Sequence, residues 1–276
     1  MMTKTWLITG ASSGLGRLMA EQLLARGDRV AATARRTNKM AELQAQYPET
    51  LIIEHLDVTD TASTRATVQH LFSSMGSIDV VVSNAGYGLF GAGEEVTDDQ
   101  IKHQITTNLI GSIQLIRAVL PYLREQGGGR IVQVSSEGGQ IAYPNFSLYH
   151  STKWGIEGFV ESVAQEVAPF GIDFIIAEPG PTGTNFAANL VRPPLMEVYE
   201  NTPAGEVRRA VDSGSFDIKG DAARTVEAMI AAADREKPAL RLTLGSTAYE
   251  SISNALTRRL AELTSQRDIA LSADSD

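Results

Sequence analysis

The sequence predicts a single α/β domain built on a doubly wound parallel sheet, and three observations indicate this class. Short apolar runs alternate with helical patterns through the first two thirds of the chain. These runs are apolar at successive positions, as in strands that helices cover on both faces. A glycine-rich turn joins the first run to the first helix. A length of 276 residues fits one domain of this kind.

The elements follow one another in a regular order. The predicted strands are the apolar runs, at residues 6–8, 29–33, 50–56, 79–83, 130–134 and 172–177. The predicted helices lie between them, at residues 15–26, about 39–46, 62–75, about 98–107, about 108–126 and about 147–168. Gly27 follows the first helix, at a position where a C-terminal cap favours glycine.

The last third of the chain departs from this alternation. Proline, glycine and scattered bulky apolar residues fill positions 180–219, and an irregular stretch of that length is often functional. We therefore predict a substrate loop there, a lid that is mobile until a ligand orders it. The domain is expected to span residues 1–266, and residues 267–276 are expected to form a frayed polar tail.

The composition argues against several classes of protein. Lys and Arg number 24 and Asp and Glu number 33, and the net charge of −9 argues against a nucleic-acid partner. The chain has no cysteine, and its four histidines lack metal-ligand spacing, so we expect no metal site. No apolar run approaches the length of a membrane span, and no signal-peptide pattern precedes the first strand. We expect a cytoplasmic protein that acts on a small molecule, without a membrane partner.

The turn after the first strand has the composition of a dinucleotide-binding turn. Its Gly-x3-Gly-x-Gly spacing lets the backbone bend sharply and approach a pyrophosphate at the N-terminus of the next helix. A tight turn without a ligand is the alternative, but the position directly after the first strand favours the cofactor. The candidate cofactor-binding residues are Gly10, Ser12, Ser13, Gly14, Leu15 and Gly16. These features make the predicted sheet Rossmann-type.

The end of the second strand indicates which dinucleotide binds. An NAD-binding unit usually has an acidic residue there, which binds the ribose 2′-hydroxyl. Here Ala34 is followed by Arg35 and Arg36, and a guanidinium binds phosphate in a planar, bidentate way. We therefore expect NADP(H), with NAD(H) as the second choice. A solvated surface pair is the alternative interpretation of the two arginines.

Small and polar residues end the third and fourth strands as well. Asp57 and Val58 follow the third strand, and Asn84, Ala85 and Gly86 follow the fourth. Ligands of doubly wound sheets bind at the carboxyl ends of the strands, so these residues are candidates for cofactor binding. By themselves they are equally consistent with an Asx turn and a helix cap.

Tyr149 and Lys153 are four residues apart on a predicted helix and therefore share one face. A phenol with a pKa near 10 is a weak acid–base catalyst at neutral pH, and a nearby ammonium favours the phenolate. Two unit charges about 4 Å apart interact by roughly 4 kcal/mol at an effective dielectric constant near 20. That energy lowers a pKa by up to about three units, which makes Tyr149 a candidate general acid–base. In isolation the same spacing is usually structural.

In its context the pair resembles the reactive site of the short-chain dehydrogenase/reductase family. The resemblance covers residues 4 to 260, and Ser136 precedes Tyr149 by thirteen positions, the family's usual gap. Ser136 is preferred over Ser135 for that reason. The motifs in family order are the turn at 9–16, Asp57, Asn84-Ala85-Gly86, Asn108, Ser136, Tyr149, Lys153 and Pro179-Gly180. The resemblance implies a nicotinamide-dependent oxidoreductase.

The resemblance also implies a role for each residue. Tyr149 passes a proton to or from the substrate oxygen, and Ser136 orients that oxygen. Lys153 binds the nicotinamide ribose and lowers the pKa of Tyr149, and Asn108 holds a water that links Lys153 to solvent. The residues implied at the nicotinamide end are Pro179, Gly180, Thr182 and Thr184.

The sequence after the last predicted strand, Glu178-Pro179-Gly180-Pro181, is closer to the retinol and 17β-hydroxysteroid dehydrogenase branch than to the acyl-carrier-protein reductases. This resemblance implies a lipophilic secondary alcohol or ketone as substrate. Family habit implies a homodimer or homotetramer. The bulky residues expected to line the pocket, or else to pack the loop on the core, are Tyr87, Phe90, Tyr143, Phe146, Phe186, Leu190, Leu195, Met196 and Tyr199. Glu137 and Glu178 are a less favoured candidate carboxylate pair.

Two other functions stay open. An epimerase or dehydratase of the same fold retains its nucleotide, but such enzymes tend to be longer, with a larger C-terminal substrate domain. In a non-catalytic dinucleotide sensor the reactive residues would typically be lost, whereas Asn108, Ser136, Tyr149 and Lys153 are all present. We therefore expect hydride transfer, with the chemistry supplied by the cofactor and the orientation by the protein.

Overall fold

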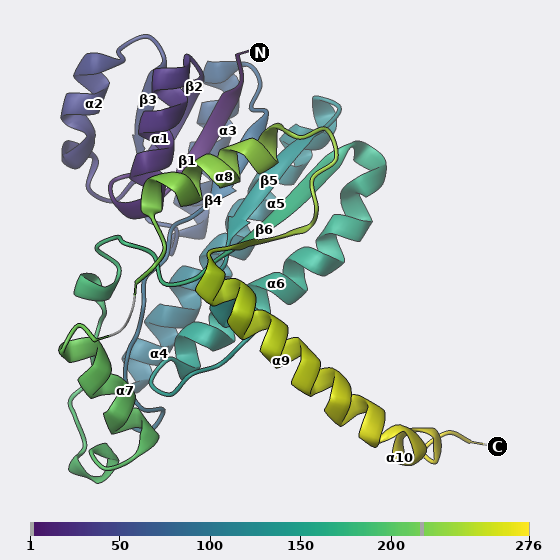
Figure 1. Ribbon diagram of the computed structural model, residues 1–276. Coiled ribbons are helices and arrows are strands. Elements are labelled where there is room, and N and C mark those ends of the chain that lie inside the picture. The colour runs from purple at the N-terminus through teal and green to yellow at the C-terminus, as the bar shows by residue number, and fades with distance from the viewer. Residues whose placement is uncertain (1–2, 216–217, 276) are drawn as a thin grey trace.

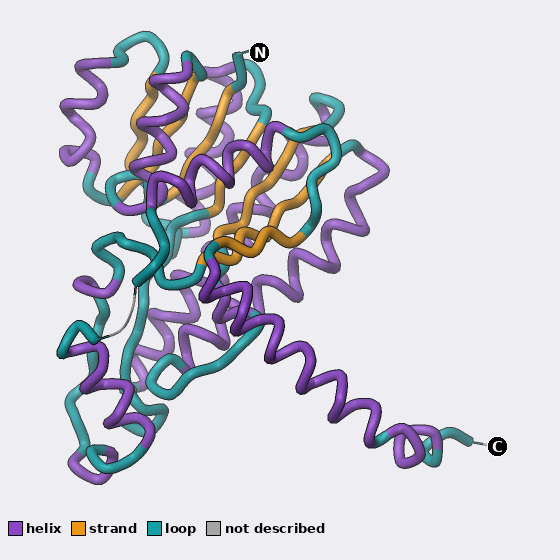
Figure 2. The backbone as a smooth tube through the Cα atoms, viewed as in Figure 1, coloured by secondary structure: helices purple, strands orange, loops and turns teal. Residues whose placement is uncertain are grey.

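The computed structural model describes residues 3–215 and 218–275 and shows helices on both faces of a seven-stranded parallel sheet (Figure 1, Figure 2). The strand order is β3-β2-β1-β4-β5-β6-β7. The strands are β1 (Thr5–Thr9), β2 (Arg29–Ala34), β3 (Leu51–His55), β4 (Val80–Ser83), β5 (Gly129–Val134), β6 (Ile172–Pro179) and β7 (Arg241–Leu244). The order reverses between β1 and β4, so the prediction of a doubly wound parallel sheet is confirmed.

Each strand sends alternate side chains into two cores, one on each face of the sheet. In β1, Trp6 and Ile8 lie in one core and Leu7 lies in the other. The helices that contribute to the first core are α1 (Gly14–Arg26), α2 (Ala41–Gln46) and α8 (Ala222–Asp234). Those that contribute to the second are α3 (Thr61–Met75), α5 (Gly111–Glu125) and α6 (Ser147–Val167). Burial on both faces explains why the strands are apolar at successive positions.

Helix α4 (Asp98–Ile105) passes through a π-helical turn, Thr106–Ile110, directly into α5. The two helices predicted here therefore form one continuous run. The π-helical turn widens the backbone at Asn108, one of the predicted site residues. Such turns occur frequently at functional sites.

The last third of the chain is more regular than predicted. The stretch 180–219 contains helix α7 (Pro203–Asp212), and β7, α8 and α9 (Ser246–Ser265) follow it. The expected polar tail begins with a short helix, α10 (Arg267–Leu271), which carries exposed Ile269 and Leu271. Residues 1–2 of the predicted domain, 216–217 of the predicted substrate loop and 276 of the predicted tail lie outside the described residues.

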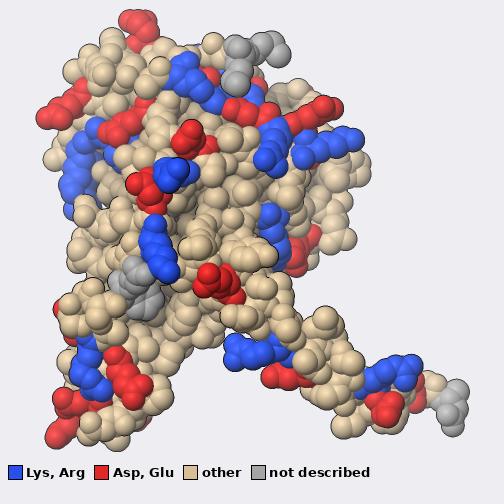
Figure 3. Space-filling model, viewed as in Figure 1, with Lys and Arg blue, Asp and Glu red and all other residues tan. Residues whose placement is uncertain are grey.

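Two observations bear on possible partners. No helix in the described part of the chain is long and apolar enough to cross a membrane. Acidic and basic side chains are intermingled over the face shown in Figure 3, rather than gathered into a basic field.

Asp28 links the start of the sheet to the end of α1 from a buried position. Its carboxylate accepts hydrogen bonds from the backbone N–H of Lys4 at 3.0 Å and from Nε1 of Trp6 at 3.1 Å. Nε of Arg26 donates to it at 3.0 Å. One carboxylate therefore satisfies donors from the N-terminal strand region and from the end of the first helix.

Asp28→Ala is expected to lower the free energy of unfolding by about 2–4 kcal/mol, because it leaves the N–H groups of Lys4 and Trp6 without an acceptor. Asp99→Ala, which removes a fully solvated carboxylate on α4, is the matched control and is expected to change little. Chemical denaturation of both variants checks this. An Asp28→Ala variant as stable as Asp99→Ala would contradict it.

Candidate active site

The glycine turn is closed by Asn84, which follows β4. Nδ2 of Asn84 donates to the carbonyl oxygens of Thr9 at 2.9 Å and Gly10 at 3.3 Å. A Cβ on Gly16 would lie 2.5 Å from this Nδ2, and one on Gly10 would lie 2.9 Å from Cα of Ala85. Gly10 also has φ +69°, a conformation that favours glycine. The missing side chains let the ends of β1 and β4 meet.

The N-terminus of α1 faces the same sheet edge. Ser13 is its N-cap residue, but the Ser13 hydroxyl makes no capping hydrogen bond. The first backbone N–H groups of a helix have no partner within the helix, so they are suited to bind an anion. Ser12 and Leu15 are half-buried, and Gly14 has φ +58°. The predicted turn residues therefore surround one helix N-terminus.

Arg35 and Arg36 follow β2 and are both exposed, while Ala34 is buried. Asp57 lies close to Arg35 at the end of β3 and accepts hydrogen bonds from the backbone N–H and the hydroxyl of Thr59, at 3.0 and 2.8 Å. Burial raises the pKa of Asp57, but these bonds and the charge of Arg35 outweigh it and hold the pKa below its ordinary value. The structure thus places a guanidinium and no acidic side chain at the tip of β2.

Asn108 is buried in the π-helical turn, and its side chain is oriented by one neighbour. Oδ1 accepts from the backbone N–H of Tyr87 at 3.1 Å, and Nδ2 donates to the Tyr87 carbonyl at 2.8 Å. Its own main-chain carbonyl accepts from the Ser112 hydroxyl at 3.0 Å. These bonds fix the orientation of the amide and of the helical turn that carries it.

Helix α6 carries Tyr149 and Lys153 on the face that meets the end of β5. Nζ of Lys153 donates to the Val134 carbonyl at 2.9 Å and lies 5.5 Å from the centroid of the Tyr149 ring. The hydroxyl of Ser136 is hydrogen-bonded to Tyr149 and accepts from the backbone N–H of Gly138 at 3.1 Å. The structure therefore brings Ser136, Tyr149 and Lys153 together, as the resemblance implies.

The acid–base balance of this group differs from the expectation. Burial raises the pKa of Tyr149 to about 12; the hydrogen bond from Ser136 lowers it and the charge of Glu137 raises it further. Burial lowers the pKa of Lys153 to about 8, against the charge of Glu157. Lys153 is directed to the Val134 carbonyl, and the expected lowering of the Tyr149 pKa by its ammonium is not among the effects that act on Tyr149.

The segment that follows β6 begins next to the turn that carries Ser136 and Glu137. The backbone N–H of Gly180 donates to the Leu244 carbonyl at 3.0 Å, and a Cβ on Gly180 would lie 3.5 Å from the Glu137 carboxylate. Thr182 donates through its hydroxyl to the Gly180 carbonyl at 2.8 Å, and the Thr184 hydroxyl accepts from the N–H of Phe186 at 3.2 Å. Pro179 ends β6 and is buried. Gly180 therefore lies near Glu137, and the segment that follows β6 starts at the carboxyl edge of the sheet.

The predicted pocket residues fall into two groups. The Tyr149 ring has the rings of Phe186 and Phe146 around it, at centroid distances of 5.6 and 6.0 Å, and Phe90 packs on Phe146 at 4.9 Å. The Tyr143 hydroxyl instead donates to the Glu137 carboxylate, and the Tyr87 ring lies 5.3 Å from that of His103 in a tilted arrangement. The outer residues of the loop are Leu190, Leu195, Met196 and Tyr199, which are half-buried or exposed.

Sequence reasoning missed a buried charge cluster behind Lys153. Arg241, on β7, forms ion pairs with Glu157 of α6 at 2.6 Å and with Glu178 of β6. Glu157 also accepts a hydrogen bond from the Ser135 hydroxyl, so α6 is linked to the residue that follows β5 and precedes Ser136. Glu178 therefore pairs with Arg241 and not with Glu137, and the suggested carboxylate pair does not form. The sequence pattern indicates this cluster only weakly, because Arg241 is distant in the sequence from Glu157 and Glu178.

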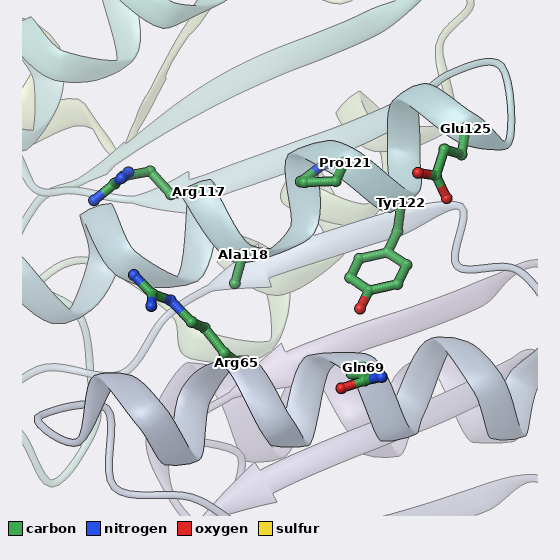
Figure 4. A pocket seen from close by; sticks show the side chains of 7 residues that line it. All are labelled: Arg65, Gln69, Arg117, Ala118, Pro121, Tyr122 and Glu125. Atoms are coloured by element: carbon green, nitrogen blue, oxygen red, sulfur yellow. The ribbon is translucent and has the colours of Figure 1, made fainter.

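His150 is a structural residue of the described site. Its Nδ1 contacts the Gly138 carbonyl at 2.8 Å and its Nε2 accepts from the N–H of Tyr143 at 3.2 Å. No group of three His, Asp or Glu residues suited to a metal is found among residues 3–215 and 218–275. A groove of about 580 Å³ between α3 and α5 lies away from the predicted site (Figure 4); its lining residues are Arg65, Gln69, Arg117, Ala118, Pro121, Tyr122 and Glu125.

The comparisons identify the family. The sequence matches the short chain dehydrogenase family over residues 4–194, and the chain belongs to that family. It is 36% identical to Oxidoreductase BOA17 of Botryotinia fuckeliana, over 99% of this chain and all of that protein. It is 36% identical to a 3-ketodihydrosphingosine reductase of Bacteroides thetaiotaomicron over 68% of each chain, and 33% identical to human 17-beta-hydroxysteroid dehydrogenase type 1 over 71% of this chain and 62% of that one.

Solved structures agree on the fold. A short-chain dehydrogenase from Streptomyces avermitilis superposes with a TM-score of 0.91 at 38% identity, covering 99% of this chain and all of its own. ElxO with NADP bound superposes with a TM-score of 0.74 at 24% identity, over 90% of this chain and all of its own, a likeness that shows the fold alone. The family resemblance stated from the sequence is therefore confirmed.

The stretch 180–219 is anchored at several points rather than irregular. Arg208 of α7 donates to both oxygens of the buried Glu95 carboxylate, at 2.8 and 2.7 Å. Nδ2 of Asn145 donates to the Ala204 carbonyl at 2.7 Å. Burial raises the pKa of Glu95, but backbone N–H donors and Arg208 outweigh it and hold the pKa below its ordinary value.

Glu95→Gln is expected to release this stretch, because it leaves the Arg208 guanidinium buried without a counter-charge, at a cost of about 3 kcal/mol. Limited proteolysis should cut within 180–219 at least about tenfold faster than in the wild type. Glu49→Gln, which changes an exposed carboxylate before β3, is the matched control. Since the folded pKa of Glu95 is depressed, its contribution is present above the ordinary value of 4.5 and is lost as the pH falls through the folded value. Equal cleavage of the two variants would rule out the anchor.

Proposed function

We propose that this protein is an oxidoreductase that prefers NADP(H) and transfers a hydride between the cofactor and a lipophilic secondary alcohol or ketone. The observation that carries the proposal is the meeting of Ser136, Tyr149 and Lys153 at the carboxyl edge of the sheet. The relatives named for 3-ketodihydrosphingosine and 17-beta-hydroxysteroid support a lipophilic substrate, as do the aromatic rings around Tyr149. A cytoplasmic homodimer or homotetramer remains a prediction.

The residues at the sheet edge fit a nicotinamide dinucleotide. Gly10 and Gly16 leave the turn without side chains, and the uncapped N-terminus of α1 offers N–H groups to the pyrophosphate. Arg35 and Arg36 are exposed and suited to the 2′-phosphate. Along the edge, the remaining residues that we propose as contacts are Ser12, Ser13, Gly14, Leu15, Asp57, Val58, Asn84, Ala85, Gly86, Pro179, Gly180, Thr182 and Thr184.

The nicotinamide, when bound, supplies or accepts the hydride. The Ser136 hydroxyl, fixed by the N–H of Gly138, orients the substrate oxygen. The Tyr149 hydroxyl gives a proton to that oxygen in reduction and takes one in oxidation. Lys153 binds the ribose and supports the phenolate by its charge. Asn108 offers its main-chain oxygen to a water that connects Lys153 with solvent.

Tyr149→Phe is expected to abolish turnover while leaving the affinity for NADPH nearly intact, because only the proton donor is lost. Lys153→Ala should reduce both, since it also removes a ribose contact. The checks are NADPH oxidation against a panel of steroid, retinoid, aryl and aliphatic ketones, and titration of cofactor binding. A Tyr149→Phe variant that keeps more than about a tenth of the wild-type rate would refute the mechanism.

The rate of alcohol oxidation is expected to rise with pH in the same experiment. Oxidation needs the phenolate, and burial sets the pKa of Tyr149 high, at about 12 before the cofactor binds. The rise should therefore continue through the alkaline range instead of levelling off near neutrality.

Arg35→Ala is expected to raise the KM for NADPH far more than the KM for NADH. A charge-assisted hydrogen bond to phosphate contributes roughly 1.5–3 kcal/mol, or about 10- to 150-fold in affinity. Ala34→Asp should turn the preference toward NAD(H), because a carboxylate repels the 2′-phosphate and accepts from the ribose hydroxyls. Steady-state kinetics with both cofactors check this, and similar constants for the two cofactors in the wild type would overturn the preference.

A further inference from the structure

Glu137 follows Ser136 and is only 3% exposed. The Tyr143 hydroxyl donates to Oε1. The Ser251 hydroxyl of α9 lies 2.9 Å from Oε2 and 2.8 Å from the Thr247 carbonyl of its own helix, so its one hydrogen is shared between these acceptors. Gly180 leaves room for the same oxygen, since a Cβ there would lie 3.5 Å away. One buried carboxylate therefore joins the turn after β5, the C-terminal helix and the segment after β6.

Helix α9 packs against the turn after β5 through apolar contacts. Ala248, Ile252 and Ala255 form a small core with Ile141, and Tyr143 packs against it. Residues 260–275 are exposed, and Figure 1 shows the helix running away from the body of the molecule. Arg259 makes a further contact of α9 with the body, since its guanidinium donates to the Gln140 carbonyl. Ser251 lies within the part of α9 that makes these contacts.

The charge of Glu137 acts on Tyr149, whose pKa it raises. The same carboxylate holds the pKa of Tyr143 well above its ordinary value, after the effect of burial. Two other titratable groups of α6 lie near: His150, which contacts the Gly138 carbonyl, and Lys153, which donates to the Val134 carbonyl. Neither is hydrogen-bonded to Glu137 in the described structure.

We propose that Glu137 is a positioning residue for the Ser136–Tyr149 pair, and that helix α9 holds it in place through Ser251. The inference rests on the proposed function for its meaning in catalysis. Glu137 fixes the turn that carries Ser136 and places a negative charge beside the phenol. The C-terminal helix thus takes part in setting the reactive geometry although it contributes no group that touches the substrate.

Glu137→Gln tests the charge. An amide can keep both hydrogen bonds, accepting from Tyr143 and donating to Ser251, so only the charge is lost. The alkaline rise of alcohol oxidation should move to lower pH by about one unit, because the phenolate forms more easily. Glu250→Gln, which removes an exposed carboxylate next to Ser251, is the matched control and should leave the profile unchanged.

Ser251→Ala tests the anchor and serves if Glu137→Gln does not fold. It should lower kcat by about threefold to tenfold with little change in the KM for NADPH or in Tm, because it frees Oε2 without opening the core. A kcat loss that only follows a loss of Tm would show a merely structural role and overturn the proposal. A wild-type pH profile in Glu137→Gln, or a wild-type kcat in Ser251→Ala, would also overturn it.

A spectroscopic titration separates this inference from the proposed function. The tyrosinate absorbance of each protein, minus that of its Tyr149→Phe counterpart, reports the ionisation of Tyr149 without any turnover. A downward shift in Glu137→Gln, together with no NADPH-dependent turnover in the wild type, would support the inference and contradict the proposed function. Turnover with an unshifted titration would contradict the inference alone.

Discussion

The carbonyl oxygen of Val134 accepts a hydrogen bond from the buried ammonium of Lys153 at 2.9 Å, and this contact joins helix α6 to the end of β5. One turn further along the helix, Glu157 binds the Ser135 hydroxyl of the same strand end. Tyr149 lies one turn earlier and meets Ser136. The proposed active site depends on this packing of α6 against the end of β5. A helix places residues four apart on one face, and the residues that follow the strand lie against that face.

Packing α6 against β5 buries acidic side chains, and an arginine that is distant in the sequence compensates their negative charge. Glu157 and Glu178 are almost fully buried, and a lone buried carboxylate is costly. Arg241, on the last strand, pairs with both, and its own pKa is raised by them against the effect of burial. β7 is thus more than an edge strand, because its guanidinium pairs with the two buried carboxylates, one of which accepts the hydrogen bond from Ser135.

The cofactor edge and the substrate side are built in different ways. At the glycine turn, the segments that follow β1 and β4 approach each other closely because Gly10 and Gly16 have no side chains. The Asn84 amide hydrogen-bonds across this approach. On the substrate side, aromatic rings gather around Tyr149, and the buried Glu95–Arg208 ion pair fixes α7. A close backbone approach suits a ligand shared across a family, whereas side chains on a separately anchored segment can vary with the substrate.

The sequence by itself determined the sheet, its first six strands, the glycine turn and the shared helix face of Tyr149 and Lys153, because these depend on local periodicity and on spacing within one helix or turn. The resemblance to the family added Ser136 to that pair. The sequence did not reveal β7 or α9, because a four-residue strand that begins with arginine and a helix with half its length exposed have weak local patterns. Tertiary structure alone decided that Glu178 faces Arg241, that Glu137 meets Tyr143 and Ser251, and that Lys153 points at the Val134 carbonyl. Those contacts join residues up to 114 positions apart, and the pKa of Tyr149 follows from the burial and charges that they create.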